Sequence, residues 1–114
     1  MSAAGDGEIL RDVEFPFPDG VFPRLLAAVV QKTVLDGLEP ARLVVHDDEN
    51  DWLIGDGVGN PNLDAACVIS HIVHVADADP TVAALASLPL GFAATRPDIE
   101  TAWEIAPHEW APDI

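Results

Sequence analysis

The stretch that decides the fold runs from Arg42 to Gly57 and reads RLVVHDDENDWLIGDG. Two short apolar runs, Leu43–Val45 and Trp52–Ile54, stand on either side of an acidic segment. β-Branched and aromatic residues favour strands, and clusters of Asp and Asn favour turns. The pattern therefore predicts a β-hairpin whose tip carries four carboxylates. These are the side chains of Asp47, Asp48, Glu49 and Asp51.

The segment before this hairpin fits two descriptions. Apolar residues recur at helical spacing from Phe22 to Val34, so one helix over residues 21–36 is possible. Ala27–Val30 fits a buried strand equally well, with a short helical turn following it at Gln31–Asp36. Gly37 suits the position just after a helix end in both cases. Periodicity does not decide between the two.

The N-terminal part predicts little regular structure. Residues 1–20 include FPFPDG, whose two prolines and glycine suit an extended segment and a turn. We expect residues 1–20 to form an extended arm, with Phe15 or Phe17 packing a ring onto the body. Residues 21–114 then form a single domain, in keeping with the length of the chain.

The elements after the hairpin are short. GDGVGNPN at 55–62 predicts a loop, and Leu63–Ala76 fits a strand leading into a helical turn, or one helix. Asp79 suits a helix N-cap and Pro80 a first helical position, so a helix is expected from Pro80 to about Ser87. Leu90–Thr95 and Thr101–Ile105 read as strands, and the tail is expected to be irregular. The predicted fold is α+β: an antiparallel sheet of about four to six strands with short helices on one face.

Charge excludes some partners. Twenty acidic residues stand against five basic ones, a formal net charge of −15. Such a field repels nucleic acid and anionic lipid, because phosphates must meet cations. It favours a basic protein partner, or simply keeps the protein in solution. No apolar run approaches the ~18–20 residues of a membrane span, and the first residues lack a signal-peptide pattern, so we expect a cytoplasmic protein.

Motifs for catalysis are weak. His71, His74 and Asp77 would share one face of a helix and suit zinc, whereas on a strand the two histidines would point to opposite faces. The H-E-x-x-H signature is missing, and so are a phosphate loop and a calcium loop. Cys67 lies in an apolar run and predicts a buried, inert thiol. We therefore expect no enzyme activity, no cofactor and no required metal; a metal-dependent hydrolase built on the two histidines and Asp77 is the competing hypothesis.

The order of these pieces resembles a family of small, functionally uncharacterised bacterial proteins. The matching stretches are AAVVQKTVLDGLEPARLVVHDDENDWLIGDG and CVISHIVHVADADPTVAALASLPLGFAATR, over about residues 27–105. The matching positions are Val34, Leu35, Gly37, Trp52, Gly57, Asp79, Pro80, Leu85, Pro89, Gly91, Ala94 and Arg96. Some members look like immunity proteins of polymorphic-toxin systems, and the resemblance also favours the strand at Ala27–Val30. The chain departs from the pattern at Leu53 and Ile54, where members often carry a further aromatic.

The functional hypothesis joins charge and resemblance. We predict an acidic protein-binding domain that neutralises a basic partner, such as a cognate toxin domain, through Asp47, Asp48, Glu49 and Asp51. Trp52 would contribute if its ring is partly exposed, and a core position for Trp52 is the alternative. Further alternatives are an adaptor that pairs with itself through a sheet edge and an anionic mimic of nucleic acid. Sequence leaves the partner's identity and the oligomeric state open.

Overall fold

One six-stranded sheet organises the chain. The computed structural model describes Leu10, residues 13–58 and residues 66–108. The strands are β1 (Ala27–Gln31), β2 (Leu43–His46), β3 (Trp52–Gly55), β4 (Cys67–His71), β5 (Phe92–Thr95) and β6 (Glu104–Pro107). The helices are α2 (Lys32–Leu35), α3 (Val73–Ala76), α4 (Pro80–Ala83) and a 3-10 turn, η1 (Ala84–Ser87). The strand order across the sheet is β4-β1-β3-β2-β5-β6.

The central hairpin is confirmed. β2 and β3 pair antiparallel, with Val44 opposite Ile54 and His46 opposite Trp52. The Asp47 N–H donates to the Asp51 carbonyl across the turn (3.0 Å). Asn50 adopts a left-handed conformation with φ 68°, which Asn tolerates better than most residues.

The segment before the hairpin is a strand followed by a helical turn. β1 occupies Ala27–Gln31, and Val30 is fully buried in it. α2 follows for one turn, and Gly37 ends it with φ 76°, its N–H donating to the Val34 carbonyl (3.1 Å). The single helix over residues 21–36 is therefore not formed. The same strand-to-helix succession appears in β4 and α3.

The sheet is mixed, so the prediction of a purely antiparallel sheet is wrong. β1 pairs with β3 in parallel, with Val29 opposite Leu53, while the other strand pairs are antiparallel. The hairpin turns its second strand toward β1, and this places β3 between β1 and β2. β1 therefore runs in the same direction as β3 and opposite to β2. Local periodicity carries no information on which hairpin strand faces β1.

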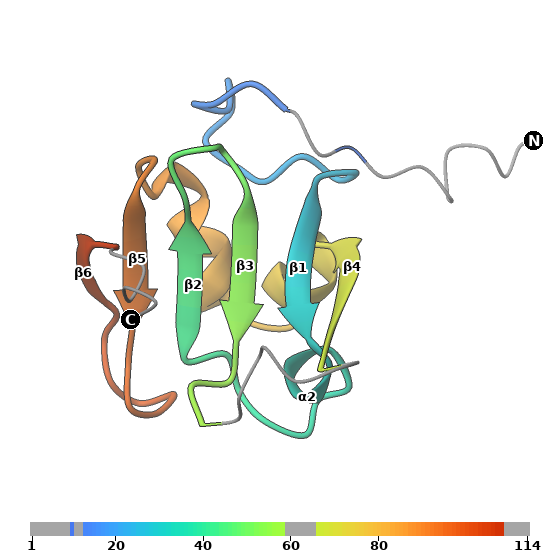
Figure 1. Cartoon of the computed structure of the whole chain (residues 1–114), viewed down its shortest axis with the longest axis vertical. Helices are drawn as coiled ribbons and strands as arrows, with labels where there is room; N and C mark the ends of the chain where they lie inside the picture. The colour runs from blue at the N-terminus through green and yellow to red at the C-terminus, as the bar shows by residue number, and fades with distance from the viewer. Residues whose placement is uncertain (1–9, 11–12, 59–65, 109–114) are drawn as a thin grey trace, which may run out of the picture.

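Helices cover one face of the sheet. The chain crosses behind it from β4 at one edge to β5 near the other, through α3, α4 and η1 (Figure 1). Their buried side chains join those of the strands in one core cluster, which includes Val30, Val44, Ile54, Ile72 and Val82. Among the described residues, no helix has the length and apolar character that crossing a membrane requires.

The later elements follow the prediction with two shifts. Asp79 caps α4 by accepting from the Thr81 N–H (3.0 Å), and Pro80 begins the helix as expected. The expected helix to Ser87 is α-helical for its first half and 3-10 for its second. β6 begins at Glu104 rather than Thr101, because Asp98 accepts from Glu100 and Thr101 in a turn.

The N-terminal arm contributes to the core within its described part. Phe17 is buried in the core cluster, and Phe15 packs against it with ring centroids 5.4 Å apart. Leu10 bridges to Leu26 beside β1. Predictions for residues 1–9 and 11–12, the second half of the Gly/Asn loop, residues 63–65 and the end of the tail fall outside the described residues.

Candidate functional site: the acidic hairpin tip and its surroundings

The turn holds its own carboxylates in place. One oxygen of Asp47, Oδ1, accepts from the backbone N–H groups of Glu49 and Asp51, both at 2.9 Å. Asp48 and Glu49 are exposed, and Asp47 and Asp51 are half-buried. The predicted acidic residues therefore do gather at one end of the molecule, at the top of β2 and β3 in Figure 1.

Three of these side chains lie close enough to share a cation. Oxygens of Asp47, Glu49 and Asp51 all lie within 4.8 Å of one another, and no other such group of three occurs in the described part of the chain. Carboxylate oxygens suit hard cations such as Ca²⁺. Exposed acidic groups are also common without an ion, so we assign no metal here.

An apolar pocket adjoins the tip on the sheet face away from α3, α4 and η1, which we call the outer face. Val29 faces Leu53 on one side and Ile69 on the other, and these positions alternate with the core residues of their strands. Together with Val45 they line a pocket of about 140 Å³. The carboxylate residues Asp47 and Asp51 complete its lining at the tip. Sheet register thus places acidic and apolar side chains side by side.

Trp52 lies in the core. Its side chain is 2% exposed, so the alternative core position holds, although Trp52 is also among the residues that line the pocket. The ring stacks on His46 at 3.9 Å between centroids and meets the edge of Phe22 at 5.0 Å. Because successive side chains of a strand point to opposite faces, the inward position of Trp52 places its neighbours Asp51 and Leu53 on the outer face.

His46 joins three segments beneath the tip. It is fully buried, with Nδ1 2.6 Å from the Leu88 carbonyl and Nε2 2.7 Å from Oδ1 of Asn50. The side-chain amide of Asn50 also donates to the Val13 carbonyl (2.8 Å). One histidine therefore connects the hairpin, the chain before β5 and the N-terminal arm.

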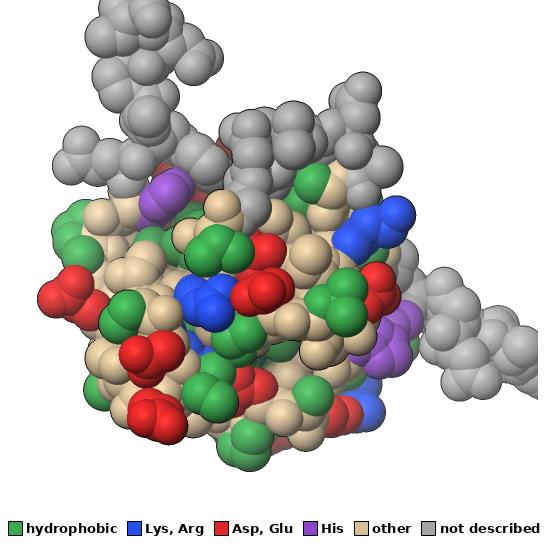
Figure 2. All heavy atoms as spheres, turned by 90° about the horizontal axis from the view of Figure 1, so that it is seen from below, with side chains coloured by type: hydrophobic (Ala, Val, Ile, Leu, Met, Phe, Trp, Pro, Cys, Tyr) green, Lys and Arg blue, Asp and Glu red, His purple; other side chains and the backbone are tan. Residues whose placement is uncertain are grey.

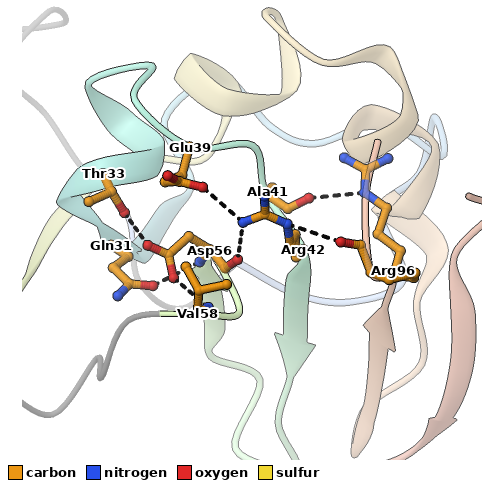
Figure 3. Close-up of polar contacts among 9 residues, drawn as sticks. Gln31, Thr33, Glu39, Ala41, Arg42, Asp56, Val58 and Arg96 are labelled. Atoms are coloured by element: carbon orange, nitrogen blue, oxygen red, sulfur yellow. Dashed lines mark hydrogen bonds and ion pairs between the residues drawn. The ribbon is translucent and has the colours of Figure 1, made fainter. Parts of the chain in front are cut away.

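A second polar group fastens the base of the hairpin (Figure 3). Asp56 is 2% exposed and accepts from the Thr33 hydroxyl (2.6 Å) and the Val58 N–H (2.9 Å). Arg42 donates to the Asp56 carbonyl (2.9 Å) and to Glu39 (3.0 Å). These contacts tie the hairpin to α2 and to the connection between α2 and β2. They serve structure, because the polar atoms are satisfied within the protein.

A third polar group surrounds Arg96, whose side chain is 1% exposed. It donates to the Ala41 carbonyl (3.0 Å), the Thr81 hydroxyl (2.9 Å) and Asp79 (2.8 Å). Trp103 lies against the guanidinium, with the ring centroid 4.0 Å away. Burial raises the pKa of Asp79, but hydrogen bonds from Thr81 and Arg96 and the charge of Arg96 together hold it below its usual value. Each guanidinium nitrogen of Arg96 has a partner within the protein and the side chain is buried, which leaves it unsuited to anion binding.

The histidines do not assemble with Asp77. His71 ends β4 and His74 lies in α3, so neither the all-helix nor the all-strand arrangement applies. Their rings lie 5.5 Å apart between centroids, while Asp77 pairs with Arg24 at 3.1 Å. Among the described residues, these three are not a group with ligand atoms within 4.8 Å of one another. The geometry gives the hydrolase hypothesis no support.

Cys67 differs from the prediction in burial. It opens the edge strand β4 and is half-buried rather than buried. Burial and the negative charge of Asp56 raise the pKa of its thiol. A raised pKa keeps the thiol protonated at neutral pH and poorly nucleophilic.

The opposite end of the molecule offers a contrast to the tip. Figure 2 views that end, and acidic side chains are scattered over it among hydrophobic ones instead of forming one patch. A wider depression of about 540 Å³ lies between α2, α3 and the β5–β6 connection, with Leu38, His74 and Ile99 in its lining. Its lining also joins carboxylates to apolar side chains, but these carboxylates, Glu39 and Asp79, form ion pairs with Arg42 and Arg96.

No family model, curated protein or solved structure matches this chain. The likeness to immunity proteins therefore rests on the sequence pattern alone.

Sequence reasoning located the tip but missed His46 and the pocket. His46 alternates with Val44 on the buried side of its strand, which was a usable signal for burial. The pocket depends on β1, β3 and β4 lying side by side, and no local pattern specifies that order.

Proposed function

We propose that this chain is a non-enzymatic, acidic protein-binding domain that docks its partner at the hairpin tip. The docking surface comprises the carboxylates of Asp47, Asp48, Glu49 and Asp51 and the adjoining pocket on the outer face. The observation that carries the proposal is the pocket itself, where Asp47 and Asp51 lie beside Val29, Leu53 and Ile69.

The two parts of this surface act on different steps of binding. Exposed carboxylates steer an oppositely charged partner and raise the association rate, an effect that salt screens. An apolar pocket lengthens the lifetime of the complex by taking a desolvated side chain. A cavity of about 150 Å³ holds a benzene-sized group, so the pocket has room for one apolar anchor. The partner class is a protein that presents such an anchor among basic residues.

The family resemblance gives this partner a biological role. Immunity proteins bind and block a cognate toxin, and a basic toxin domain would match the net charge of −15. A partner of this kind would meet the protein in the cytoplasm. A toxin gene beside the gene for this chain would support the assignment, and a metabolic operon would count against it.

The charge part is tested by association kinetics. A partner captured from the native cell extract is purified, and binding is followed at two salt concentrations. Neutralising the tip with Asn or Gln at positions 47, 48, 49 and 51 keeps an acceptor at Asp47 for the turn. We expect association to slow by about tenfold or more at low salt, with a flatter salt dependence. The matched control neutralises four exposed carboxylates elsewhere: Asp36, Asp77, Glu100 and Glu104. Equal rates for the tip variant and the wild type would refute docking at the tip.

The pocket part is tested by dissociation kinetics. Ile69 lines the pocket and is 53% exposed, so Ile69→Ser removes a wall at little cost to folding. Ile99→Ser is the control, because Ile99 is 61% exposed and lines the depression at the other end. We expect faster dissociation for Ile69→Ser alone. Matching dissociation rates for the two variants would remove the pocket from the surface.

One observation favours a second candidate, self-association through a sheet edge. β6 is an edge strand with all four residues exposed, including Ile105 at 51%. Glu104 and Pro107 within it oppose pairing, because charge and proline blunt an edge. Sedimentation over a range of concentrations separates the candidates, since a docking domain stays monomeric and an adaptor does not.

A further inference from the structure

We propose that His46 is a buried imidazolium whose proton fastens the N-terminal arm to the acidic tip, and that loss of this proton releases the arm. The protonation state and the link to the arm stand on hydrogen-bond geometry alone. The consequence for partner binding rests on the proposed function, because Asn50 belongs to the turn that carries the docking carboxylates.

The partners of the imidazole determine its protons. Nδ1 faces the Leu88 carbonyl, which can only accept, so Nδ1 carries a proton. The Asn50 amide donates its Nδ2 to the Val13 carbonyl, and this orients Oδ1 toward Nε2 of His46. Nε2 therefore also meets an acceptor and carries a proton. An imidazole with protons on both nitrogens is the cation.

The surroundings accommodate a cation. Both hydrogen bonds are short, at 2.6 and 2.7 Å, as charge-assisted bonds are. The ring lies 3.9 Å from the Trp52 ring with 10° between their planes, and an aromatic face attracts positive charge. Phe15 closes the other approach at 4.6 Å.

The charges on the surrounding elements are all negative. Within the described residues, the arm up to Phe17, the tip, β3, β5 and residues 88–91 contain no lysine or arginine. Their acidic groups are Glu14, Asp47, Asp48, Glu49 and Asp51. Among the described residues a further titratable group nearby is His108, whose backbone N–H donates to the Gly91 carbonyl next to β5. No positive charge on the described part of these elements therefore opposes a cation at His46.

Deprotonation breaks this arrangement. A neutral ring has one N–H, and the fixed Leu88 carbonyl retains it. The bare Nε2 then faces Oδ1 of Asn50, which leaves two acceptors in contact. Turning the amide over satisfies Nε2 but sets Oδ1 against the Val13 carbonyl, where the amide donated at 2.8 Å. Only the second arrangement keeps a partner on the fully buried ring, so the amide turns and the arm loses its hydrogen bond at Val13. The arm is held at lower pH and released as pH rises.

NMR tests the protonation state without any partner. Side-chain ¹⁵N spectra from about pH 5 to about pH 9 separate the imidazolium from the neutral tautomers. We expect both ring nitrogens of His46 to be protonated at the low end, with two slowly exchanging N–H protons. The amide signals of Val13 and Phe15 should shift together with the His46 ring as pH rises. The exposed His74 is the internal control, and its titration should leave the arm signals unmoved. One bare nitrogen on His46 throughout, or arm signals that ignore the His46 transition, would overturn the proposal.

Variants at position 50 separate the two hydrogen bonds. Asn50→Asp still accepts from Nε2 but has no donor for Val13, and aspartate tolerates the left-handed backbone there. We expect His46 to stay doubly protonated in this variant while the arm is released at every pH. Asn50→Ala loses both contacts, and its arm should likewise stop responding to pH. An arm that still follows the His46 transition in Asn50→Asp would contradict the link.

Binding kinetics at two pH values distinguish this inference from the proposed function. If both hold, partner binding changes with pH in the wild type and not in Asn50→Asp. If the tip is not a docking site, the NMR result stands and binding shows no such difference. If His46 is neutral, the tip-charge variants still slow association.

Discussion

At the scale of single residues, the ion pair between Arg96 and Asp79 joins the end of β5 to the start of α4. Asp79 caps α4, while Arg96 follows β5 and reaches back to it at 2.8 Å. The cap was predictable from Asp79-Pro80 alone, because capping is local. The ion pair was not, since it needs the end of β5 to return beside α4.

Asp79→Asn should lower the free energy of unfolding by about 3 kcal/mol at neutral pH, because it leaves the buried guanidinium of Arg96 without its counter-charge. The pKa of Asp79 lies below its ordinary 3.8, so its ionisation stabilises the fold above that pH and ceases to do so as pH falls further. The difference between wild type and variant, measured by urea denaturation, should therefore shrink below pH 3.8. Asp77→Asn is the control: its pair with Arg24 is exposed, and its removal should cost less than about 0.5 kcal/mol. Similar losses for the two variants would contradict this account.

At the scale of elements, a left-handed backbone conformation explains why glycine stands after α2 and after β3. Gly37 ends α2 and Gly57 follows β3, and both have φ 76°. Their surroundings differ. A Cβ at position 37 would meet nothing within 4 Å, whereas one at position 57 would lie 3.0 Å from Cβ of Arg42.

Gly37→Ala should therefore cost about 1 kcal/mol of stability, from left-handed backbone strain alone. Gly57→Ala should cost about 1 to 3 kcal/mol more, because the methyl group also forces Arg42 and the hairpin base to shift. Thermal unfolding followed by circular dichroism measures both. Equal losses at the two positions would mean that Arg42 and the hairpin base can shift at no cost. That result would contradict an account in which the hydrogen bonds of Arg42 and Asp56 hold the base in place.

The elements also show where sequence patterns stop being informative. Strands and turns in Arg42–Gly57 were predictable because alternation and an acidic turn are local signals. The parallel pairing of β1 with β3 was not, since it depends on which side of the hairpin meets β1. The same limit applies to the candidate site, where the carboxylates were foreseeable and the adjoining pocket was not. Trp52 illustrates it at one position, since only the fold directs its ring inward.

At the scale of the whole molecule, repulsion among the many acidic side chains lowers the free energy of unfolding. Twenty acidic residues face five basic ones, and the acidic side chains are scattered even at the end opposite the tip (Figure 2). Scattered like charges repel one another in the compact state, which destabilises the fold at low ionic strength.

Sodium chloride should therefore stabilise the protein. Raising its concentration from about 10 mM to about 300 mM shortens the screening length severalfold and should raise the melting temperature by about 4 °C, equivalent to about 1 kcal/mol. The tip variant, neutralised at positions 47, 48, 49 and 51, and the control variant, neutralised at positions 36, 77, 100 and 104, each lack four carboxylates. Both should therefore melt at a higher temperature than the wild type at low salt, and their melting temperatures should respond less to added salt. Both variants should therefore gain stability at low salt, and only the tip variant should lose partner association. A melting temperature that falls with salt would show that ion pairs such as Arg96–Asp79 outweigh the repulsion. A much larger effect for the tip variant would show that the repulsion is concentrated at the hairpin, where four carboxylates share one turn.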